Sequence, residues 1–375
     1  MTTAKNQTKY TSIGNRPVRH DGYDKVTGKA QYGADVDLPG LIHGKILRSP
    51  HAHAKIISID TSAAENLPDV YAVITNKDFP AQKDEAVSKI PGPAINLKQQ
   101  TANILAGDKV LYKGHAVAAI AATSAHAAEE ALALINVQYE ILPHVSTVEE
   151  AISEGAPLLH NQYKNNIASH DVLELGDIES GFSQADLIVE REFRTSTVHQ
   201  GYIEPHSATG WWTPSNKITV WGSSQGHFQI RDRTSLVLGV PVSDIKVIPM
   251  EIGGGFGGKT TIYLEPVTAL LSKITGYPVK ITMSRSEVLE ATGPTSGSYM
   301  HVKFGATKEG KITSAQADLK FEAGAYPGSP VGAASNCIFT PYAIDNLRID
   351  GYDICLLYTS PRPRDATLAR MPSSA

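Results

Sequence analysis

The feature that most restricts the fold is a cluster of glycines in the second half of the chain. Five of the six residues from 253 to 258 are glycine, with Phe256 among them, and Lys259 follows. Glycine adopts backbone conformations with positive φ that other residues avoid, so the cluster is unsuited to the interior of a strand or helix. Because the preceding stretch IKVIPMEI reads as a strand, we predict a tight loop at its end, whose backbone amides can approach a ligand closely.

Three interpretations of this loop are open: a ligand-binding loop, a structural turn that packs Phe256 inward, or a nucleotide-binding motif. The outer glycines followed by Lys259 and Thr260 satisfy the P-loop spacing, in which the lysine would meet a phosphate. However, Phe256 interrupts the loop, and no apolar strand ending in Asp follows clearly. The dinucleotide motif is disfavoured because the segment about 20 residues later, 278–280, reads PVK and contains no acidic residue. A P-loop-like phosphate-binding protein therefore remains the weaker alternative.

Cysteine content limits the possible redox chemistry. The 375 residues include two cysteines, Cys337 and Cys355, which are too few for a four-cysteine zinc site or an iron–sulfur cluster. A net charge of -4 gives no basic surface for nucleic acid. No apolar run approaches 18 residues, and the polar amino terminus lacks the apolar core of a signal peptide. We therefore expect a cytoplasmic protein that binds neither nucleic acid nor membrane.

Hydrophobic periodicity and composition divide the chain near residue 145. We expect an N-terminal extension over 1–19, a small α+β domain over 20–145 and a mainly stranded segment over 146–354. Predicted strands cover 43–50, 54–60, 70–75 and 135–142, a predicted hairpin joins 208–212 to 217–224, and predicted helices cover 124–135, 228–238 and 263–275.

The last 21 residues, 355–375, differ from the rest of the chain. They contain three prolines and three arginines and do not continue the alternation of the preceding strand. The segment is either a natural terminus or a foreign tail, and it resembles translated adapter or vector sequence. We predict that the native reading frame ends near Ile354.

Several polar residues are candidates for chemistry. Gln225 lies between a predicted strand and a predicted helix, a location that active-site groups favour, although a cap or turn residue is the alternative. Glu204 and His206 could form an acid/base pair or belong to a polar cluster lining a cleft. His51 and His53 would share one face of a strand, but no third metal ligand lies nearby, so packing roles are favoured.

Eight short segments occur in an order that is specific when they are taken together: 24–30, 47–54, 114–118, 137–143, 203–206, 224–225, 253–259 and 324–326. In this order they resemble the large, molybdenum-cofactor-binding subunit of the xanthine dehydrogenase/aldehyde oxidase family of molybdenum hydroxylases. The resemblance covers nearly all of 14–354. It implies an α+β fold in which an α/β-hammerhead domain precedes the first part of the molybdopterin-binding region.

The resemblance also implies the chemistry. The family holds molybdenum in a pyranopterin, either molybdopterin or its cytosine dinucleotide, and transfers water-derived oxygen to an aldehyde or an electron-poor carbon. Carried over to this chain, Gln225 hydrogen-bonds an oxo ligand of the metal, and Gly254, Gly255, Phe256 and Gly257 lie against the cofactor. The electrons leave through 2Fe-2S clusters to FAD, so the scarcity of cysteine implies separate iron–sulfur and FAD subunits.

Two departures from the family pattern matter. Thr260 stands where purine-oxidising members carry an acidic residue, and 330–334 lacks their substrate-binding arginine. This favours aldehydes, N-heterocycles or aromatic acyl-CoA thioesters over xanthine. Family members also continue for several hundred residues, which carry the general-base glutamate and most pterin contacts. We therefore expect this chain alone to be inactive, either as a truncated, non-catalytic fragment or as one part of a split subunit.

Overall fold

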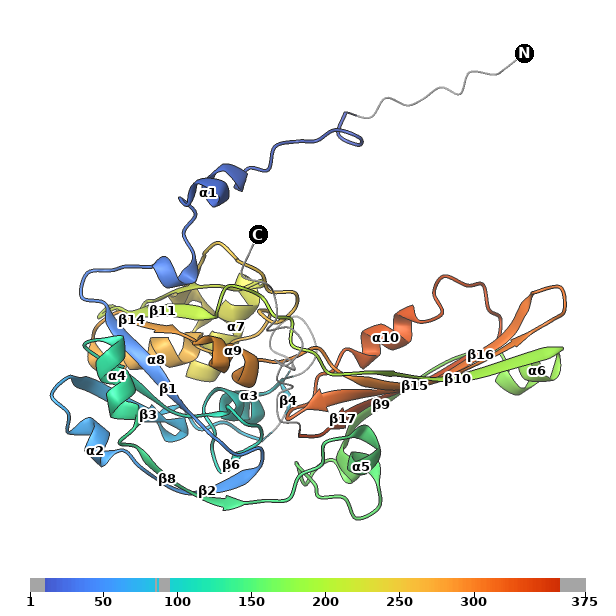
Figure 1. Ribbon diagram of the computed structural model, residues 1–375, viewed down its shortest axis with the longest axis horizontal. Coiled ribbons are helices and arrows are strands. Elements are labelled where there is room, and N and C mark those ends of the chain that lie inside the picture. Colours follow the sequence, from blue (N-terminus) through green and yellow to red (C-terminus); the bar gives the residue numbers. More distant parts are fainter. Residues whose placement is uncertain (1–10, 85, 88–94, 358–375) are drawn as a thin grey trace, which may run out of the picture.

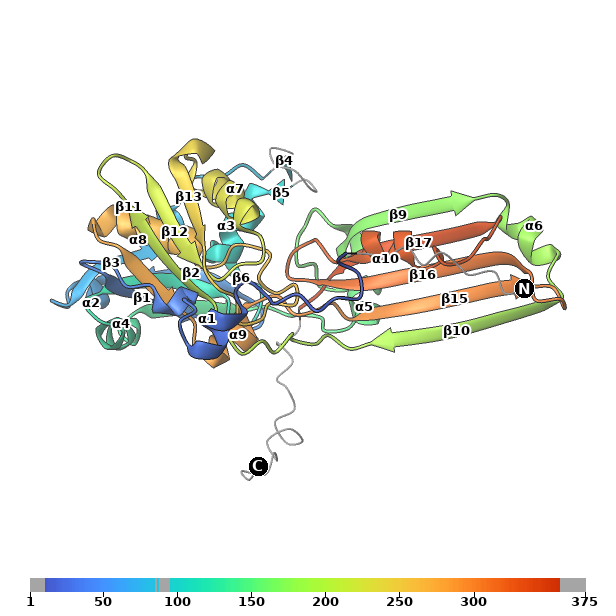
Figure 2. The same cartoon turned by 90° about the horizontal axis from the view of Figure 1, so that it is seen from above.

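The protein combines an α/β lobe with a long sheet that extends away from it (Figures 1 and 2). The computed structural model describes residues 11–84, 86–87 and 95–357. Within these ranges the strands form sheets of seven, five, three and two strands. The α+β class predicted from the sequence is confirmed.

The seven-stranded sheet is built from both halves of the chain. Its strand order is β13-β12-β11-β14-β1-β7-β3. β1 pairs in parallel with β14, from Ile42 opposite Val279 to Gly44 opposite Ile281. The two segments on either side of residue 145 therefore share one hydrogen-bonded sheet, while the predicted domain limits stay predictions. The strands are β1 (Ile42–Arg48), β3 (Val70–Thr75), β7 (Ala116–Ala122), β11 (Ser207–Trp212), β12 (Ile218–Gly222), β13 (Ile245–Pro249) and β14 (Val279–Thr282).

Small residues let helices approach this sheet closely on both faces. All seven residues of β7 are buried, and alternate side chains pack against α4 (Ala125–Leu132) on one face and the main core on the other. On the main-core face, α8 (Glu265–Thr275) packs against β11 at Gly210, where a Cβ would lie 2.6 Å from the backbone nitrogen of Ala269. Both helices end where predicted to within a few residues, α8 at Gly276 with φ 75°.

The predicted hairpin and the helix after it are confirmed. β11 and β12 pair in antiparallel fashion, and α7 (His227–Leu238) ends at Gly239 with φ 65°. No helix in the described ranges is long and apolar enough to cross a membrane. The remaining elements of this lobe are α1 (Gly22–Thr27), β2 (Ala54–Asp60), α2 (Ser62–Glu65), β4 (Ala86–Val87), β5 (Ile95–Asn96), α3 (Leu97–Ile104), β6 (Lys109–Val110), β8 (Asn136–Ile141) and α9 (Arg285–Ala291), with short 3-10 helices at Gly33–Asp35, Asn76–Asp78 and Val242–Asp244.

The five-stranded sheet, drawn as the long sheet in Figure 2, has two unlike faces. Its order is β10-β15-β16-β17-β9. One face packs Leu319 and Ile349 against Val331 of α10 (Val331–Cys337) and against Phe339. The other carries ion pairs such as Arg348 Nε with Asp350 Oδ2 at 2.7 Å. The strands are β9 (Ile167–Leu175), β10 (Leu187–Thr195), β15 (Ser298–Ala306), β16 (Ile312–Gly324) and β17 (Leu347–Cys355), and α5 (Val148–Ile152), α6 (Ile178–Ser183) and the 3-10 helix Lys164–Asn166 lie beside them.

The packed chain includes the first three residues of the segment predicted to be foreign. Cys355 ends β17, and Leu356 and Leu357 are buried. The backbone nitrogen of Leu357 donates to the carbonyl oxygen of Val145 at 2.9 Å. The rest of that segment, 358–375, lies outside the described residues, as do residues 1–10 of the predicted extension. The predicted end of the native frame near Ile354 stays a prediction.

His115, at the start of β7, makes the fold sensitive to acid. Its Nε2 faces the carbonyl oxygen of Ala102 at 2.7 Å, and its Nδ1 accepts from the backbone nitrogen of Leu111 at 3.1 Å. These contacts require a neutral ring. Burial lowers the pKa of His115 from 6.5 to about 4, against the opposing hydrogen bond to Ala102.

Because the unfolded chain then binds more protons below pH 6.5, His115 contributes stability that is lost as the pH falls toward 4. Between pH 7.5 and pH 5 we expect a loss of about 2 kcal/mol from this residue. Urea unfolding at both pH values should show a smaller loss for His115→Asn, even though this variant starts less stable. An equal loss in the two proteins would contradict the assignment.

Candidate cofactor site at the glycine loop

The loop 253–259, between β13 and α8, makes a tight turn. Three of its residues have positive φ, namely Gly254 at 102°, Phe256 at 49° and Gly257 at 92°. The backbone nitrogen of Gly258 donates to the carbonyl oxygen of Gly255 at 2.8 Å. Phe256 is 74% exposed, so the interpretation that packs it inward is wrong. A bulky residue with positive φ is costly and persists where surrounding structure enforces it, which is frequent at binding sites.

Gln225 is fixed against this loop. Its backbone nitrogen donates to the carbonyl oxygen of Lys259 at 2.8 Å. Its Oε1 accepts from the backbone nitrogens of Gly257 at 2.9 Å and Lys259 at 3.2 Å. Since both partners are donors, the amide oxygen must face the loop, and the Nε2 group is left free to donate elsewhere. Gln225 is thus a partner of the loop and does not cap α7, whose N-cap, Gly226, has no side-chain bond.

Two physical requirements explain the glycines. At Gly255 a Cβ would lie 2.5 Å from Oε1 of Gln225, and at Gly258 it would lie 2.8 Å from Cε1 of Tyr202. Gly257 has open space around it, so its requirement is the left-handed backbone. The glycines therefore let the loop touch Gln225 and Tyr202 while turning sharply.

The loop leaves unused hydrogen-bond donors. Within the described residues, the backbone nitrogens of Gly254, Gly255 and Phe256 donate to no protein acceptor, and neither does Nε2 of Gln225. Successive free N–H groups in a turn of mixed handedness form a concave site for anionic or strongly polar oxygen. The geometry therefore provides a cradle of neutral donors beside an exposed side-chain amide.

A buried ion pair closes the loop. Nζ of Lys259 lies 2.6 Å from Oε2 of Glu204, and the same oxygen accepts from the backbone nitrogen of Gly253 at 2.8 Å. One carboxylate oxygen thus holds the first and last residues of the loop. Lys259 is 1% exposed, and burial lowers the pKa of its ammonium group against the opposing effect of Glu204.

This ion pair and the position of α8 both argue against the P-loop interpretation raised by the sequence. Lys259 is not available to a phosphate, because its Nζ is buried and bonded to Glu204. α8 begins only at Glu265, so the loop does not lead directly into a helix as a P-loop does. The phosphate-binding alternative therefore has neither an available lysine nor a helix directly after the loop.

Glu204 and His206 do not form an acid/base pair. Nε2 of His206 lies 2.7 Å from the Tyr202 hydroxyl, which lies 3.1 Å from Oγ1 of Thr292. Burial lowers the pKa of His206 to about 3, so its ring is neutral at physiological pH. These residues form a buried polar cluster that supports the loop from behind through Tyr202.

The two N-terminal histidines have packing roles. Nδ1 of His53 lies 2.7 Å from the carbonyl oxygen of Pro143, and the ring of His51 contacts that of Tyr139. In the part of the chain that the structure describes, no three His, Cys, Asp or Glu residues are grouped as metal ligands. The metal pair considered from the sequence is therefore not supported.

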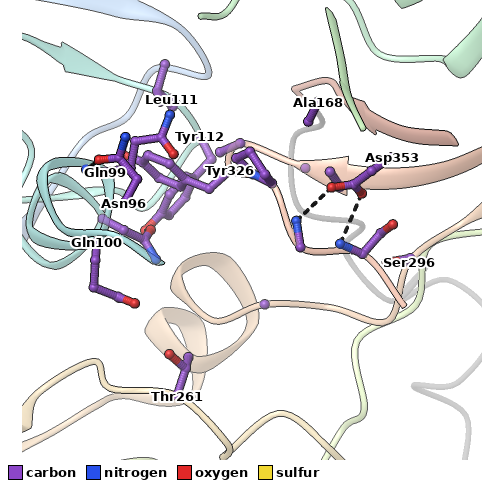
Figure 3. Close-up of a pocket in the computed structure, with 18 of the residues that line it drawn as sticks. Asn96, Gln99, Gln100, Leu111, Tyr112, Ala168, Thr261, Ser296, Tyr326 and Asp353 are labelled. Atoms are coloured by element: carbon purple, nitrogen blue, oxygen red, sulfur yellow. Dashed lines mark hydrogen bonds between the residues drawn. The ribbon is translucent and has the colours of Figure 1, made fainter. Parts of the chain in front are cut away.

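A cavity of about 710 Å³ is lined in part by residues that follow the loop, and Figure 3 shows part of its lining. Thr261 and Tyr263, just after the loop, line one side, and Tyr326 lines another. The Asp353 carboxylate accepts from the backbone nitrogens of Gly328 at 2.8 Å and Ser329 at 3.0 Å, which shapes the wall formed by 323–329. The sequence singled out 324–326 but gave no sign that this segment faces a cavity.

Two family models match this chain. Residues 27–143 match the aldehyde oxidase and xanthine dehydrogenase a/b hammerhead domain, and residues 159–362 match the molybdopterin cofactor-binding domain. The second match covers more than half of the chain, and it includes Gln225 and the glycine loop. The predicted order of the two regions is confirmed.

Characterised relatives agree with these matches. The chain is 32% identical over 348 residues to the nicotinate dehydrogenase large molybdopterin subunit of Eubacterium barkeri, covering 91% of this chain and 78% of that protein. It is 33% identical to the carbon monoxide dehydrogenase large chain of Afipia carboxidovorans, covering 87% and 41%. It therefore spans less than half of the second relative.

Solved structures show the same fold. Carbon monoxide dehydrogenase from Oligotropha carboxidovorans superimposes with a TM-score of 0.77 at 30% identity, covering 92% of this chain and 45% of that one. Quinoline 2-oxidoreductase from Pseudomonas putida 86 gives a TM-score of 0.82 at 25% identity, covering 93% and 45%. From the family matches, these relatives and the shared fold, the chain belongs to the molybdenum-binding large subunits of the xanthine dehydrogenase/aldehyde oxidase family.

Proposed function

We propose that the glycine loop and Gln225 bind a molybdenum–pyranopterin cofactor in an oxidoreductase that hydroxylates an aldehyde, an N-heterocycle or a related carbon. The observation that carries the proposal is the row of free backbone donors at 254–256 beside the free amide of Gln225. Neutral N–H donors without an acceptor fit the oxygen atoms of such a cofactor. At Gly255 a Cβ would lie 2.5 Å from Oε1 of Gln225, so the glycine keeps the free amide of Gln225 beside these donors. When bound, the cofactor supplies the redox centre that oxidises substrate carbon with oxygen derived from water.

The residues of this chain have a positioning and electrostatic role. Nε2 of Gln225 can donate to an oxygen ligand of the molybdenum, and the amides of Gly254, Gly255 and Phe256 can donate to the cofactor. Such neutral donors stabilise negative charge on oxygen without themselves exchanging a proton. The loop is held before the cofactor arrives, because Glu204 and Lys259 already fix its two ends.

Electron transfer requires partners under this proposal. Cys337 on α10 is exposed and Cys355 on β17 is buried, and neither is paired. We propose separate iron–sulfur (2Fe-2S) and FAD subunits as acceptors, since two lone cysteines cannot ligate a cluster. Molybdopterin and its cytosine dinucleotide both remain compatible with the loop.

The substrate proposal rests on Thr260, which directly follows the glycine loop. Thr260, at the position where purine-oxidising members carry an acid, donates from Oγ1 to the carbonyl oxygen of Gly257 at 3.0 Å. It therefore offers no carboxylate to a purine ring. The names of two relatives include nicotinate and quinoline, which are N-heterocycles, whereas the names of others include xanthine. The preference against purines therefore rests on Thr260.

The test is the cofactor content of the chain after production in a host that makes molybdopterin. We expect purified protein to contain molybdenum and pterin in equal amounts. Gln225→Met should lower both about tenfold, because loss of one hydrogen bond to a charged group costs about 1.5–3 kcal/mol. Metal analysis and pterin fluorescence measure the two contents.

Gln184→Met is the matched control, since Gln184 lies at the end of α6 and its side chain bonds only to Ser180. It should retain the full cofactor content. Absence of molybdenum and pterin from the unmodified chain would support the competing view that this polypeptide is a non-catalytic fragment of such a subunit.

A further inference from the structure

Arg233 on α7 lines the cavity without a charged partner. Its NH1 donates to Oε1 of Gln100 at 3.1 Å and to Oγ1 of Thr261 at 2.9 Å. Both acceptors are neutral, and no carboxylate of the described residues pairs with the guanidinium. Arg231, on the same helix, contrasts with it, because its NH2 lies 2.8 Å from Oδ1 of Asp232.

The Nε–NH2 edge of Arg233 has no acceptor among the described residues. Nε is buried, whereas NH2 is not among the buried atoms, so NH2 is the nitrogen of this edge that a ligand can reach. Its N–H groups can donate to a carboxylate oxygen in a charge-assisted hydrogen bond. An anion at NH2 would offset the cost of partly burying this charge, which no carboxylate of the described residues offsets.

The other charges of the cavity are already satisfied. Its described lining contains two carboxylates besides Arg233. Glu290 pairs with Nζ of Lys113 at 2.8 Å, and Asp353 accepts from the backbone nitrogens of Gly328 and Ser329. Arg233 is thus the charged residue of the described lining that has no partner of opposite charge. Tyr112, Tyr263 and Tyr326 make other parts of the lining aromatic.

We infer that Arg233 binds the carboxylate of an anionic aromatic or heteroaromatic substrate in this cavity. The inference rests on the proposed function and names its substrate class. Arg233 lies seven residues along α7 from Gly226, which corresponds to about 10 Å of helix. Its partner Thr261 follows the loop by two residues.

Binding of a matched pair of probes to the full chain tests the inference. Pyridine-3-carboxylate and pyridine-3-carboxamide have the same ring and differ in charge. We expect the chain to bind the carboxylate about tenfold more tightly than the amide by ligand-observed NMR titration, a modest value for one hydrogen bond between two charged groups. Arg233→Met should bind both equally, and Arg233→Lys should keep part of the preference.

Arg231→Met is the matched control and should keep the preference of the unmodified chain. Retained binding of the amide by Arg233→Met shows that the cavity is still folded. The inference is overturned if the unmodified chain has no preference for the carboxylate, or if Arg233→Met retains it.

A phosphate of the cofactor is another oxyanion that could occupy this edge. If so, Arg233→Met would lose molybdenum and pterin as Gln225→Met does, and inorganic phosphate would displace the carboxylate probe with higher affinity. That pair of results would overturn the assignment to substrate. Because the probes are titrated against cofactor-free chain, failure here is distinct from failure to find molybdenum and pterin.

Discussion

Replacement of Lys259 by methionine is expected to lower the free energy of unfolding by about 3–5 kcal/mol, the usual cost of removing one partner from a buried ion pair. Methionine has a similar length and no charge, so it leaves the Glu204 carboxylate buried opposite an apolar group. The side chains of Lys259 and Glu204 are 0% and 10% exposed, so water cannot readily replace the lost contact. Urea unfolding followed by circular dichroism measures the difference.

The double variant Lys259→Met with Glu204→Gln separates the charge effect from packing. It carries no uncompensated charge, and we expect it to recover part of the lost stability. Hydrogen exchange adds a local readout, since the amide of Gly253 should exchange faster when its acceptor is disturbed. A single variant as stable as the unmodified chain would show that the pair does not hold the loop.

Replacement of Gly255 by alanine is expected to have a different result, with a large loss of cofactor and a moderate loss of stability. The added Cβ would lie 2.5 Å from Oε1 of Gln225. Cδ and Cγ of Gln225 would lie 2.6 Å and 2.9 Å from this Cβ as well, so the whole side chain must move, at a cost of about 1–3 kcal/mol. Its bonds to Gly257 and Lys259 would be broken, and molybdenum and pterin contents should fall about tenfold, as for Gln225→Met.

Two other glycines serve as controls for this variant. Gly332→Ala on α10 meets no atom within 4 Å and should retain full cofactor content, with a slight gain in stability from helix propensity. Gly257→Ala also meets no atom but requires φ of 92°, so backbone strain should destabilise it. A Gly255→Ala protein with normal cofactor content would show that the position of Gln225 against the loop is not required.

Features with local signals were predictable from the sequence. The hairpin of β11 and β12 has a turn signal between two apolar runs, and α7 and α8 end at Gly239 and Gly276, each in the left-handed conformation. In these cases the residues that determine the structure lie within a few positions of it. The parallel pairing of β1 with β14 has no such signal, because Ile42 and Val279 meet across more than 200 residues of intervening chain.

The site was predictable to a similar extent. Gln225 and the glycine loop were singled out, and the structure brings them into direct contact. The roles of Glu204 and Lys259 were not predictable, because these residues are separated by 55 positions and each has a more familiar use, in acid/base chemistry or phosphate binding. Arg233 carried no signal beyond being a cation on a helix that follows Gln225, since only packing shows which of two neighbouring arginines lacks an acid.

The parallel pairing of β1 with β14 has a consequence for protein engineering. Three residue pairs join these strands. Arg48 at the end of β1 and Glu287 on α9, the helix that follows β14, add an ion pair of 3.1 Å. A chimera that takes residues up to 145 from one relative and the remainder from another must therefore match strand register and charge across this seam. Recombination between relatives should succeed more often when β1 and β14 come from one parent. This holds even though the two family models divide the chain between these strands.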